Sequence, residues 1–218
     1  MRKASARFVL PALIFIGFVA SASCTPLGDP ALPTDGFFDD FERDSLGEAY
    51  RTTGPLRLYR IEDGELRVEG AKNRPLWLAR KLPRDVRVEF TARSESPSGD
   101  IKVELFGDGV SKATSTSYTA SGYVIIFGGW NNTVNTIARM DEHGSDRVIG
   151  KAKRVERGKN YRFLIERRGN LLTVAIDGEE IMRLEDPNPL YGRGHDHFAF
   201  NNWNSRLAFD DLRITPLR

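Results

Sequence analysis

The sequence predicts an all-β domain, an antiparallel sandwich or barrel, from three observations. Several short segments alternate apolar and polar residues with a period of two, which is typical of half-buried strands. Turn residues separate these segments at intervals of about 8 to 12 residues, and no segment sustains an amphipathic helical period over three turns. The clearest alternating segments are RVEFTA at 87–92, IKVELF at 101–106, YRFLIER at 161–167 and LLTVAI at 171–176.

Short turn sequences predict where consecutive strands form hairpins. Asp63 and Gly64 precede the segment ELRVEG, and residues 168–170 (Arg-Gly-Asn) separate two of the alternating segments. Asp177 and Gly178 form the next turn signal, because Asp-Gly pairs accept the positive φ angles of tight hairpins.

Both ends of this region carry a short strand-like run with paired acids, DDFERDSL at 39–46 and LAFDDLRITPL at 207–217. We expect these two runs to pair with each other. The span 37–218 fits one domain by length and is large enough to bury a substantial core.

The N-terminal residues 1–23 have the pattern of a secretory signal peptide. Arg2, Lys3 and Arg7 precede an apolar run over residues 8–20, which ends in small residues. At about 13 residues the run is shorter than the roughly 20 that a membrane-spanning helix needs. We therefore expect cleavage and a mature chain without a transmembrane helix.

Cys24 is the only cysteine, so the chain has no internal disulfide. With the preceding Ser-Ala-Ser it resembles the lipobox of bacterial lipoproteins, although Ser21 replaces the commonest Leu. The resemblance implies acylation of Cys24, a lipid anchor as the only membrane contact, and a place in the bacterial cell envelope, at the outer membrane or cell surface. The alternative is an ordinary secreted protein cleaved near Ala22.

Residues 24–36 read as a tether, because the segment TPLGDPALPTDG is rich in proline and has no apolar periodicity. Proline-rich chain extends by about 3.1 Å per residue, so about 12 residues can hold a domain about 35 to 40 Å from a lipid surface.

The charge balance gives no reason to expect a nucleic acid partner. The chain has 32 Lys plus Arg and 30 Asp plus Glu, and loss of the signal peptide removes three of the cations. The excess of +2 then becomes about −1.

The order of motifs from 37 to 217 resembles the concanavalin-like jelly rolls: FDDFE, IEDGELRVEG, GYVIIFGG, NYRFLIERRGNLLTVAIDGEEI and FAFNNWNSRLAFDDLRITPL. It is also similar to bacterial laminin-G-like domains and to the 3-keto-disaccharide hydrolase group. Separately, YVIIFGGWNNTVNTIAR at 123–139 resembles the signature of the domain named after farnesoic acid O-methyltransferase. These resemblances imply a jelly-roll β-sandwich over residues 37–218.

Two clusters that combine Trp with Asn indicate glycan binding, because a sugar stacks its C–H face on an aromatic ring and hydrogen-bonds through its hydroxyls. The Ser/Thr-rich segment 111–122 is expected to be a long loop bordering the ligand face. The alternative is that these Trp belong to the core and the Asn serve turns, which is our expectation for Trp77. The candidate ligand-binding residues are Trp130, Asn131, Asn132, Arg139, Asn202 and Trp203.

The catalytic motifs that we considered are absent. Retaining β-glucanases of this fold resemble one another in an E-x-D-x-x-E strand motif, whose nearest approach here is at 42–47 and has Gly in the last place. Neither G-x-S-x-G nor a nucleotide-binding glycine loop occurs. The second hypothesis is an enzyme of the 3-keto-disaccharide hydrolase kind, and a third is a protein–protein adhesion module. The candidate acids and bases are Asp141, Glu142, His143 and His195.

The jelly-roll resemblance suggests a calcium ion as cofactor, and acidic residues at the two domain ends are its candidate ligands. The alternative is that these acids only promote solubility. His195 and His197 are candidate ligands for a zinc or copper ion. This signal is weaker, since two histidines alone rarely make a metal site. The candidate calcium ligands are Asp39, Asp40, Glu42, Asp210 and Asp211.

Overall fold

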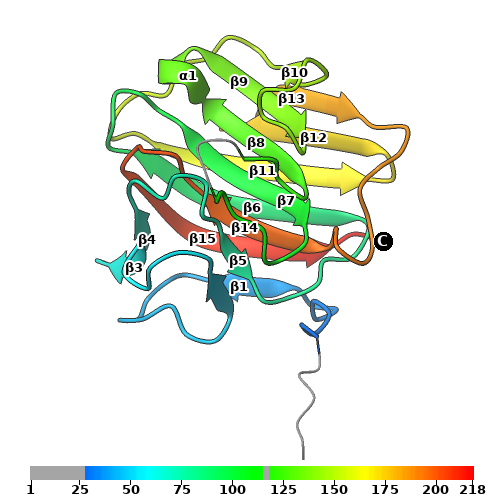
Figure 1. The fold of residues 1–218 in the computed structure, drawn as a ribbon, viewed down its shortest axis with the longest axis horizontal. Helices are drawn as coiled ribbons and strands as arrows, with labels where there is room; N and C mark the ends of the chain where they lie inside the picture. Colours follow the sequence, from blue (N-terminus) through cyan, green and yellow to red (C-terminus); the bar gives the residue numbers. More distant parts are fainter. Residues whose placement is uncertain (1–27, 115–117) are drawn as a thin grey trace, which may run out of the picture.

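The structure is a computed structural model that describes residues 28–114 and 118–218. The predicted signal peptide, Cys24 and the first residues of the tether lie outside the described residues. The described chain forms two antiparallel sheets packed face to face in a jelly-roll sandwich (Figure 1). The predicted all-β fold class is therefore confirmed. No helix within these two ranges is long and apolar enough to cross a membrane.

We name the two layers the β6 sheet and the β7 sheet, after a central strand of each. The β6 sheet has the order β13 (Glu179–Glu185), β12 (Leu171–Ile176), β11 (Asn160–Arg168), β6 (Val86–Ser94), β15 (Leu207–Pro216), β4 (Glu65–Val68) and β3 (Tyr59–Glu62), with β1 (Phe37–Asp39) also pairing with β15. The β7 sheet has the order β10 (Val148–Ile149), β9 (Val134–Arg139), β8 (Tyr123–Gly128), β7 (Ile101–Gly107), β14 (His197–Asn201), β5 (Leu76–Leu78) and β2 (Tyr50–Thr52). One short turn, α1 (Gly129–Asn132), follows β8.

The four alternating segments coincide with β6, β7, β11 and β12, and the predicted hairpin turns join the expected strands. Asp63 and Gly64 have φ angles of 55° and 70°, and Asp177 and Gly178 have 55° and 80°. Two successive positive φ angles define the tight turn that matches the twist of a hairpin.

The two ends of the domain pair with each other, but the ladder between β1 and β15 uses residues Phe37–Asp39, with Phe37 opposite Ile214. Of the predicted run 39–46, Asp39 alone lies in the ladder, opposite Leu212, and the chain leaves the strand after it. The Asp39 carboxylate accepts a hydrogen bond from the backbone N–H of Phe41 at 2.9 Å and binds the Arg43 guanidinium. This local cap turns the chain, and Phe41 adopts a φ of 53°.

The core lies between the sheets and is rich in phenylalanine. Phe90 of the β6 sheet stacks on Phe163 with ring centroids 4.7 Å apart, and it meets Phe200 of the β7 sheet edge-on at 5.9 Å. Alternate residues of β6, beginning with Val86, are buried. Trp77 is fully buried, as predicted, but it lies apart from this central cluster.

The described part of the predicted tether packs against the domain. Asp29 accepts hydrogen bonds from Arg51 at 2.6 and 2.8 Å, and its carboxylate lies 2.9 Å from Nε2 of His197, the first residue of β14. Leu32 donates its backbone N–H to the carbonyl of Lys81 at 2.8 Å. The chain is thus fixed to the sandwich from Asp29 onward.

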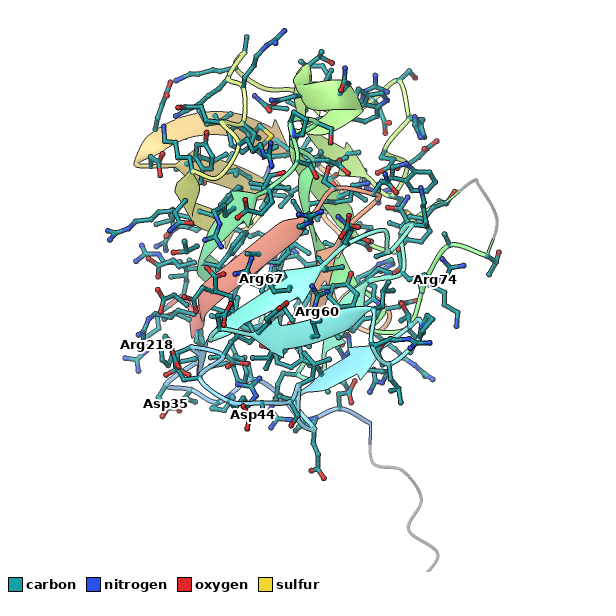
Figure 2. All side chains as sticks on the ribbon, turned by 90° about the vertical axis from the view of Figure 1, so that its left-hand side faces the viewer. Asp35, Asp44, Arg60, Arg67, Arg74 and Arg218 are labelled. Atoms are coloured by element: carbon teal, nitrogen blue, oxygen red, sulfur yellow. The ribbon has the colours of Figure 1, made fainter. Side chains whose placement is uncertain are left out.

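The positive charges of the arginines on the β3–β4 hairpin are neutralised by acidic residues of the same hairpin. Arg60 and Arg67 are register partners and lie side by side in Figure 2. Arg60 pairs with Glu62 at 3.0 Å, and Arg67 pairs with Glu65 at 2.5 Å. Over residues 59–68 the hairpin therefore carries no excess of positive charge.

Candidate functional site

A cavity of about 490 Å³ opens on the outer face of the β7 sheet, at the end where β7 begins. Its lining combines two tryptophans with several buried polar groups. The lining residues are Asn73, Ser98, Asp100, Lys102, Tyr118, Ile126, Trp130, Asn131, Glu142, His143, Trp203, Asn204 and Ser205.

The sheet order brings the two Trp clusters to this one cavity. β8 and β14 both flank β7 and both run antiparallel to it, so they end at the same edge of the sheet. Trp130 follows the end of β8, and Trp203 follows the end of β14. Strands two apart are separated by about 9 to 10 Å. The two indole rings, 37% and 36% exposed, therefore stand on opposite sides of the start of β7.

Trp130 occupies a left-handed turn. Its φ and ψ are 48° and 60°, and the next two residues, Asn131 and Asn132, also have positive φ. Asn tolerates this region, whereas for a bulky residue it is an outlier with a cost of about 1 to 3 kcal/mol. The ring meets His143 edge-on at 5.6 Å, and the Arg147 guanidinium lies over it at 5.1 Å.

The buried amide of Asn132 holds this turn. Its Nδ2 donates to the carbonyl oxygens of Val155 at 2.8 Å and Pro97 at 3.3 Å, and its Oδ1 accepts the Val155 N–H at 2.8 Å. Three hydrogen bonds to neighbouring backbone explain why the strained conformation persists.

Trp203 is fixed by residues 71–73. The Lys72 ammonium lies over its ring at 4.5 Å, and the Lys72 backbone N–H donates to the Trp203 carbonyl at 2.8 Å. The neighbouring Asn202 is fully buried, accepts the Ala71 N–H at 2.9 Å and donates to the Ser205 carbonyl at 2.6 Å. Its amide therefore shapes the turn that carries Trp203.

The cavity floor contains a buried ion pair. Lys102 and Glu142 are 2% and 8% exposed, and Lys102 Nζ donates to Glu142 Oε2 at 2.7 Å. Asn73 bridges the pair, since its Oδ1 accepts from Lys102 at 3.1 Å and its Nδ2 donates to Glu142 Oε1 at 3.2 Å. The charges are mutually compensated, as burial requires.

Glu104 lies on the same face of β7, beneath the cavity. It is fully buried, and burial raises the pKa of its carboxyl group to about 8. The Tyr118 hydroxyl lies 2.9 and 3.1 Å from its two oxygens, and Asn201 Nδ2 donates to it at 2.6 Å. Near neutral pH this carboxyl is therefore mostly protonated.

Asp100 immediately precedes β7 and lines the cavity. Burial raises the pKa of its carboxyl group, the Lys102 charge opposes that rise, and the Glu142 charge adds to it. A hydrogen bond with the backbone of Trp203 also opposes the rise in this pKa, and no ion pair to Asp100 occurs within residues 28–114 and 118–218.

The structure separates the predicted ligand-binding residues into two groups. Trp130, Asn131 and Trp203 line the cavity. Asn132 and Asn202 are buried behind it, with their amides bonded to backbone. Arg139 is not among the lining residues; its Nε donates to Asp186 at 3.1 Å.

Of the four predicted acids and bases, two line the cavity and two do not. Glu142 and His143 line the cavity, with His143 Nε2 lying 3.8 Å from Glu142 Oε1. Asp141 caps the turn by accepting the His143 N–H at 2.9 Å, and His195 Nδ1 lies 2.7 Å from the Ser121 carbonyl. Neither Asp141 nor His195 lines the cavity.

The acids proposed for calcium serve local contacts. Both oxygens of Asp39 are bonded to the Arg43 guanidinium, and the second also accepts from the Tyr50 hydroxyl at 2.7 Å. Asp210 accepts the Asp211 N–H at 2.7 Å, and Asp40 accepts the Glu42 N–H at 3.2 Å. Across the described ranges no group of three or more His, Cys, Asp or Glu could hold a metal ion. Calcium binding by these residues is not confirmed and stays a prediction.

Sequence reasoning missed the buried floor. Lys102 and Glu104 alternate along β7 and so share its outer face, and Asp100 lines the cavity from the position before the strand. The alternation over 101–106 predicts a strand with one exposed face, whereas Lys102 and Glu104 on the outer face are both buried. The companion Asn73 comes from a loop that no local pattern marks, whereas Tyr118 belongs to the segment 111–122 that is expected to border the ligand face, and it lines the cavity.

Comparisons with known proteins agree on the fold. A structure reported with endo-acting O-glycanases of the human gut microbiota shares 15% identity at a TM-score of 0.62, covering 84% of this chain and 99% of that one. The carbohydrate-binding module CBM66 from Bacillus subtilis shares 11% at 0.57, covering 78% and 98%. A β-1,3-1,4-glucanase (lichenase) from a mouse hindgut metagenome shares 12% at 0.59, covering 84% and 100%. At these identities the likeness establishes the concanavalin-like jelly roll.

No known family profile matches the chain. A curated relative, an extracellular exo-α-L-arabinofuranosidase of Streptomyces chartreusis, is 31% identical over 71 residues. The match covers 33% of this chain and 9% of the relative, so the chain corresponds to a small part of that protein.

Proposed function

We propose that this protein is a carbohydrate-binding module that holds a glycan in the cavity between Trp130 and Trp203. The observation that carries the proposal is the pairing of two half-exposed indoles with a buried polar floor in one cavity. Sugars need an apolar face and fixed hydrogen-bonding groups together. The carbohydrate-related names among the structural neighbours support the same class of ligand.

Binding combines stacking with preorganised hydrogen bonds. Arg147 lies over the ring of Trp130 and Lys72 over that of Trp203, so each cation limits the movement of one indole. Asp100 and Asn131 supply polar groups to the sugar hydroxyls. Asn132 and Asn202 act as positioning residues that fix the two turns.

We also propose that the domain is displayed from the bacterial envelope through lipidated Cys24. β14 begins at His197, against which Asp29 is docked, and it ends beside Trp203. The described N-terminal segment thus meets the sandwich about 16 Å from the Trp203 end of the strand, away from α1 in Figure 1. An anchor at this end would leave the cavity directed away from the membrane.

The test is binding of the purified protein to a glycan array and to insoluble polysaccharides, beside Trp130→Ala and Trp203→Ala. Each variant should bind at least about 10-fold more weakly, which corresponds to about 1.4 kcal/mol. Phe38→Ala is the matched control, because Phe38 is 48% exposed and carries Arg213 over its ring at 4.6 Å, outside the cavity. Equal loss in the control, or no binding by the wild type, would contradict the proposal.

The second candidate function is glycoside processing. It is favoured by two acids, Asp100 and Glu142, lying in the same cavity beside His143. Its test is release of soluble sugar from each bound polysaccharide by the wild type and by Glu142→Gln. Release that disappears in Glu142→Gln would establish an enzyme, whereas binding without release supports the module.

The adhesion alternative needs a continuous apolar surface. Among the described residues outside the cavity, the exposed large apolar side chains come from separate strands and loops. They are Phe38, Leu56, Val110, Ile149 and Tyr191.

A further inference from the structure

We infer that the cavity is closed at one end and accepts the terminal units of a glycan, so that chain ends are bound in preference to internal segments. This inference rests on the proposed function and adds the class of ligand. The inference follows from the side chains that cover the outer face of the β7 sheet along β7.

Trp77 fills the far end of that face. Its neighbours Leu76 and Leu78 point into the core, so the Trp77 side chain points outward from β5. It is nevertheless fully buried, and its Nε1 donates to the Ser111 carbonyl at 3.0 Å. A Cβ on Gly107, the last residue of β7, would overlap the indole. The ring therefore occupies the surface beyond Glu104.

Described residues of the connection between β7 and β8 cover the remainder. Ala113, Tyr118 and Ala120 pack on outward-facing residues of β8 and β9 in a second, separate apolar cluster. Tyr118 is also bonded to Glu104 through its hydroxyl and is one of the lining residues. An oligosaccharide lying along the sheet would meet Tyr118 and could not continue past it.

The solvent exposure of the lining residues decreases from the rim of the cavity to its closed end. Trp130, Asn131, Trp203 and Asn204 at the rim are exposed, whereas the floor and the closed end are buried. A volume of about 490 Å³ lies in the lower half of the ~300 to 1,000 Å³ range of small-molecule sites, which is room for about two to three sugar units.

The lining carries two carboxyl groups and one ammonium, so uncharged oligosaccharides are the suitable probes. Ladders of one to six units from arabinan, laminarin and lichenan would be titrated calorimetrically into the full-length protein. For a ladder that binds, affinity should rise up to two or three units and then stay within about twofold. A rise of more than threefold for each added unit up to six would overturn the inference while leaving the proposed function intact.

A second measurement counts chain ends. The parent polysaccharide would be cut to progressively shorter chains by partial acid hydrolysis, and the protein bound per milligram would be measured. Capacity should increase in proportion to the number of ends. Capacity that stays constant would overturn end recognition alone, and failure of every ladder and polysaccharide to bind would overturn both proposals.

Discussion

Replacing Glu104 by Gln should remove a pH dependence of stability that the wild-type protein carries. Burial raises the pKa of this carboxyl from 4.5 to about 8 in the folded state, whereas in the unfolded chain it titrates near its ordinary value. The folded state therefore holds the proton more tightly, and this contribution is complete below about pH 4.5 and is lost as pH rises to about 8. At 1.36 kcal/mol per pH unit, the interval amounts to about 5 kcal/mol.

Gln keeps the shape of the side chain, and its amide can still accept from Asn201 and donate to the Tyr118 oxygen. Urea unfolding at pH values from 5 to 9 would measure the free energy of unfolding of both proteins. The stability of Glu104→Gln relative to wild type should improve by about 1.4 kcal/mol per pH unit up to pH 8 and then level off. Glu48→Gln, at an exposed carboxyl, should run parallel to wild type. Parallel curves for Glu104→Gln would refute the reasoning.

Three further substitutions test the architecture of the cavity by urea unfolding. Lys102→Met leaves the buried Glu142 carboxylate uncompensated and should lower the free energy of unfolding by about 3 to 5 kcal/mol. Adding Glu142→Gln should restore at least half of that loss. A loss under about 1 kcal/mol in Lys102→Met would contradict the role of the ion pair. Gly107→Ala should cost about 1 to 3 kcal/mol because the new methyl overlaps Trp77, and a neutral result would show that the indole moves freely. Trp130→Gly should fold at least as stably as wild type while losing glycan binding, since Gly accepts a positive φ without strain; a loss above about 1 kcal/mol would show that the ring supports the fold.

The strands and hairpins could be predicted because their signals are local. The alternation in β6 and β11 and the Asp-Gly turns each report on a few adjacent residues, and the structure confirms them. The early end of β1 was not predictable, because it depends on the Asp39 side chain bonding to Arg43 instead of continuing the ladder.

The site could be predicted only in part, because the sequence shows local signals and not the contacts between distant residues. Two Trp–Asn clusters stand out in the sequence, and sheet order then brings them together. Whether an amide faces a ligand or a carbonyl is not encoded locally, so Asn131 and Asn132 look equivalent although only Asn131 lines the cavity. The bond between Lys102 and Glu142 joins residues 40 positions apart, and no sequence period marks such a pair.

Backbone strain gives an independent argument that this cavity is the functional site. Twelve non-glycine residues in the described ranges have positive φ, and four of them line the cavity, a far larger share than its part of the chain. Such conformations cost free energy and persist where surrounding contacts over-determine them, which is common at ligand sites. Here the left-handed residues hold an indole, two amides and a carboxyl group in fixed directions around one volume. A surface that served only to cover the sheet would not need this arrangement, whereas a preorganised binding site does.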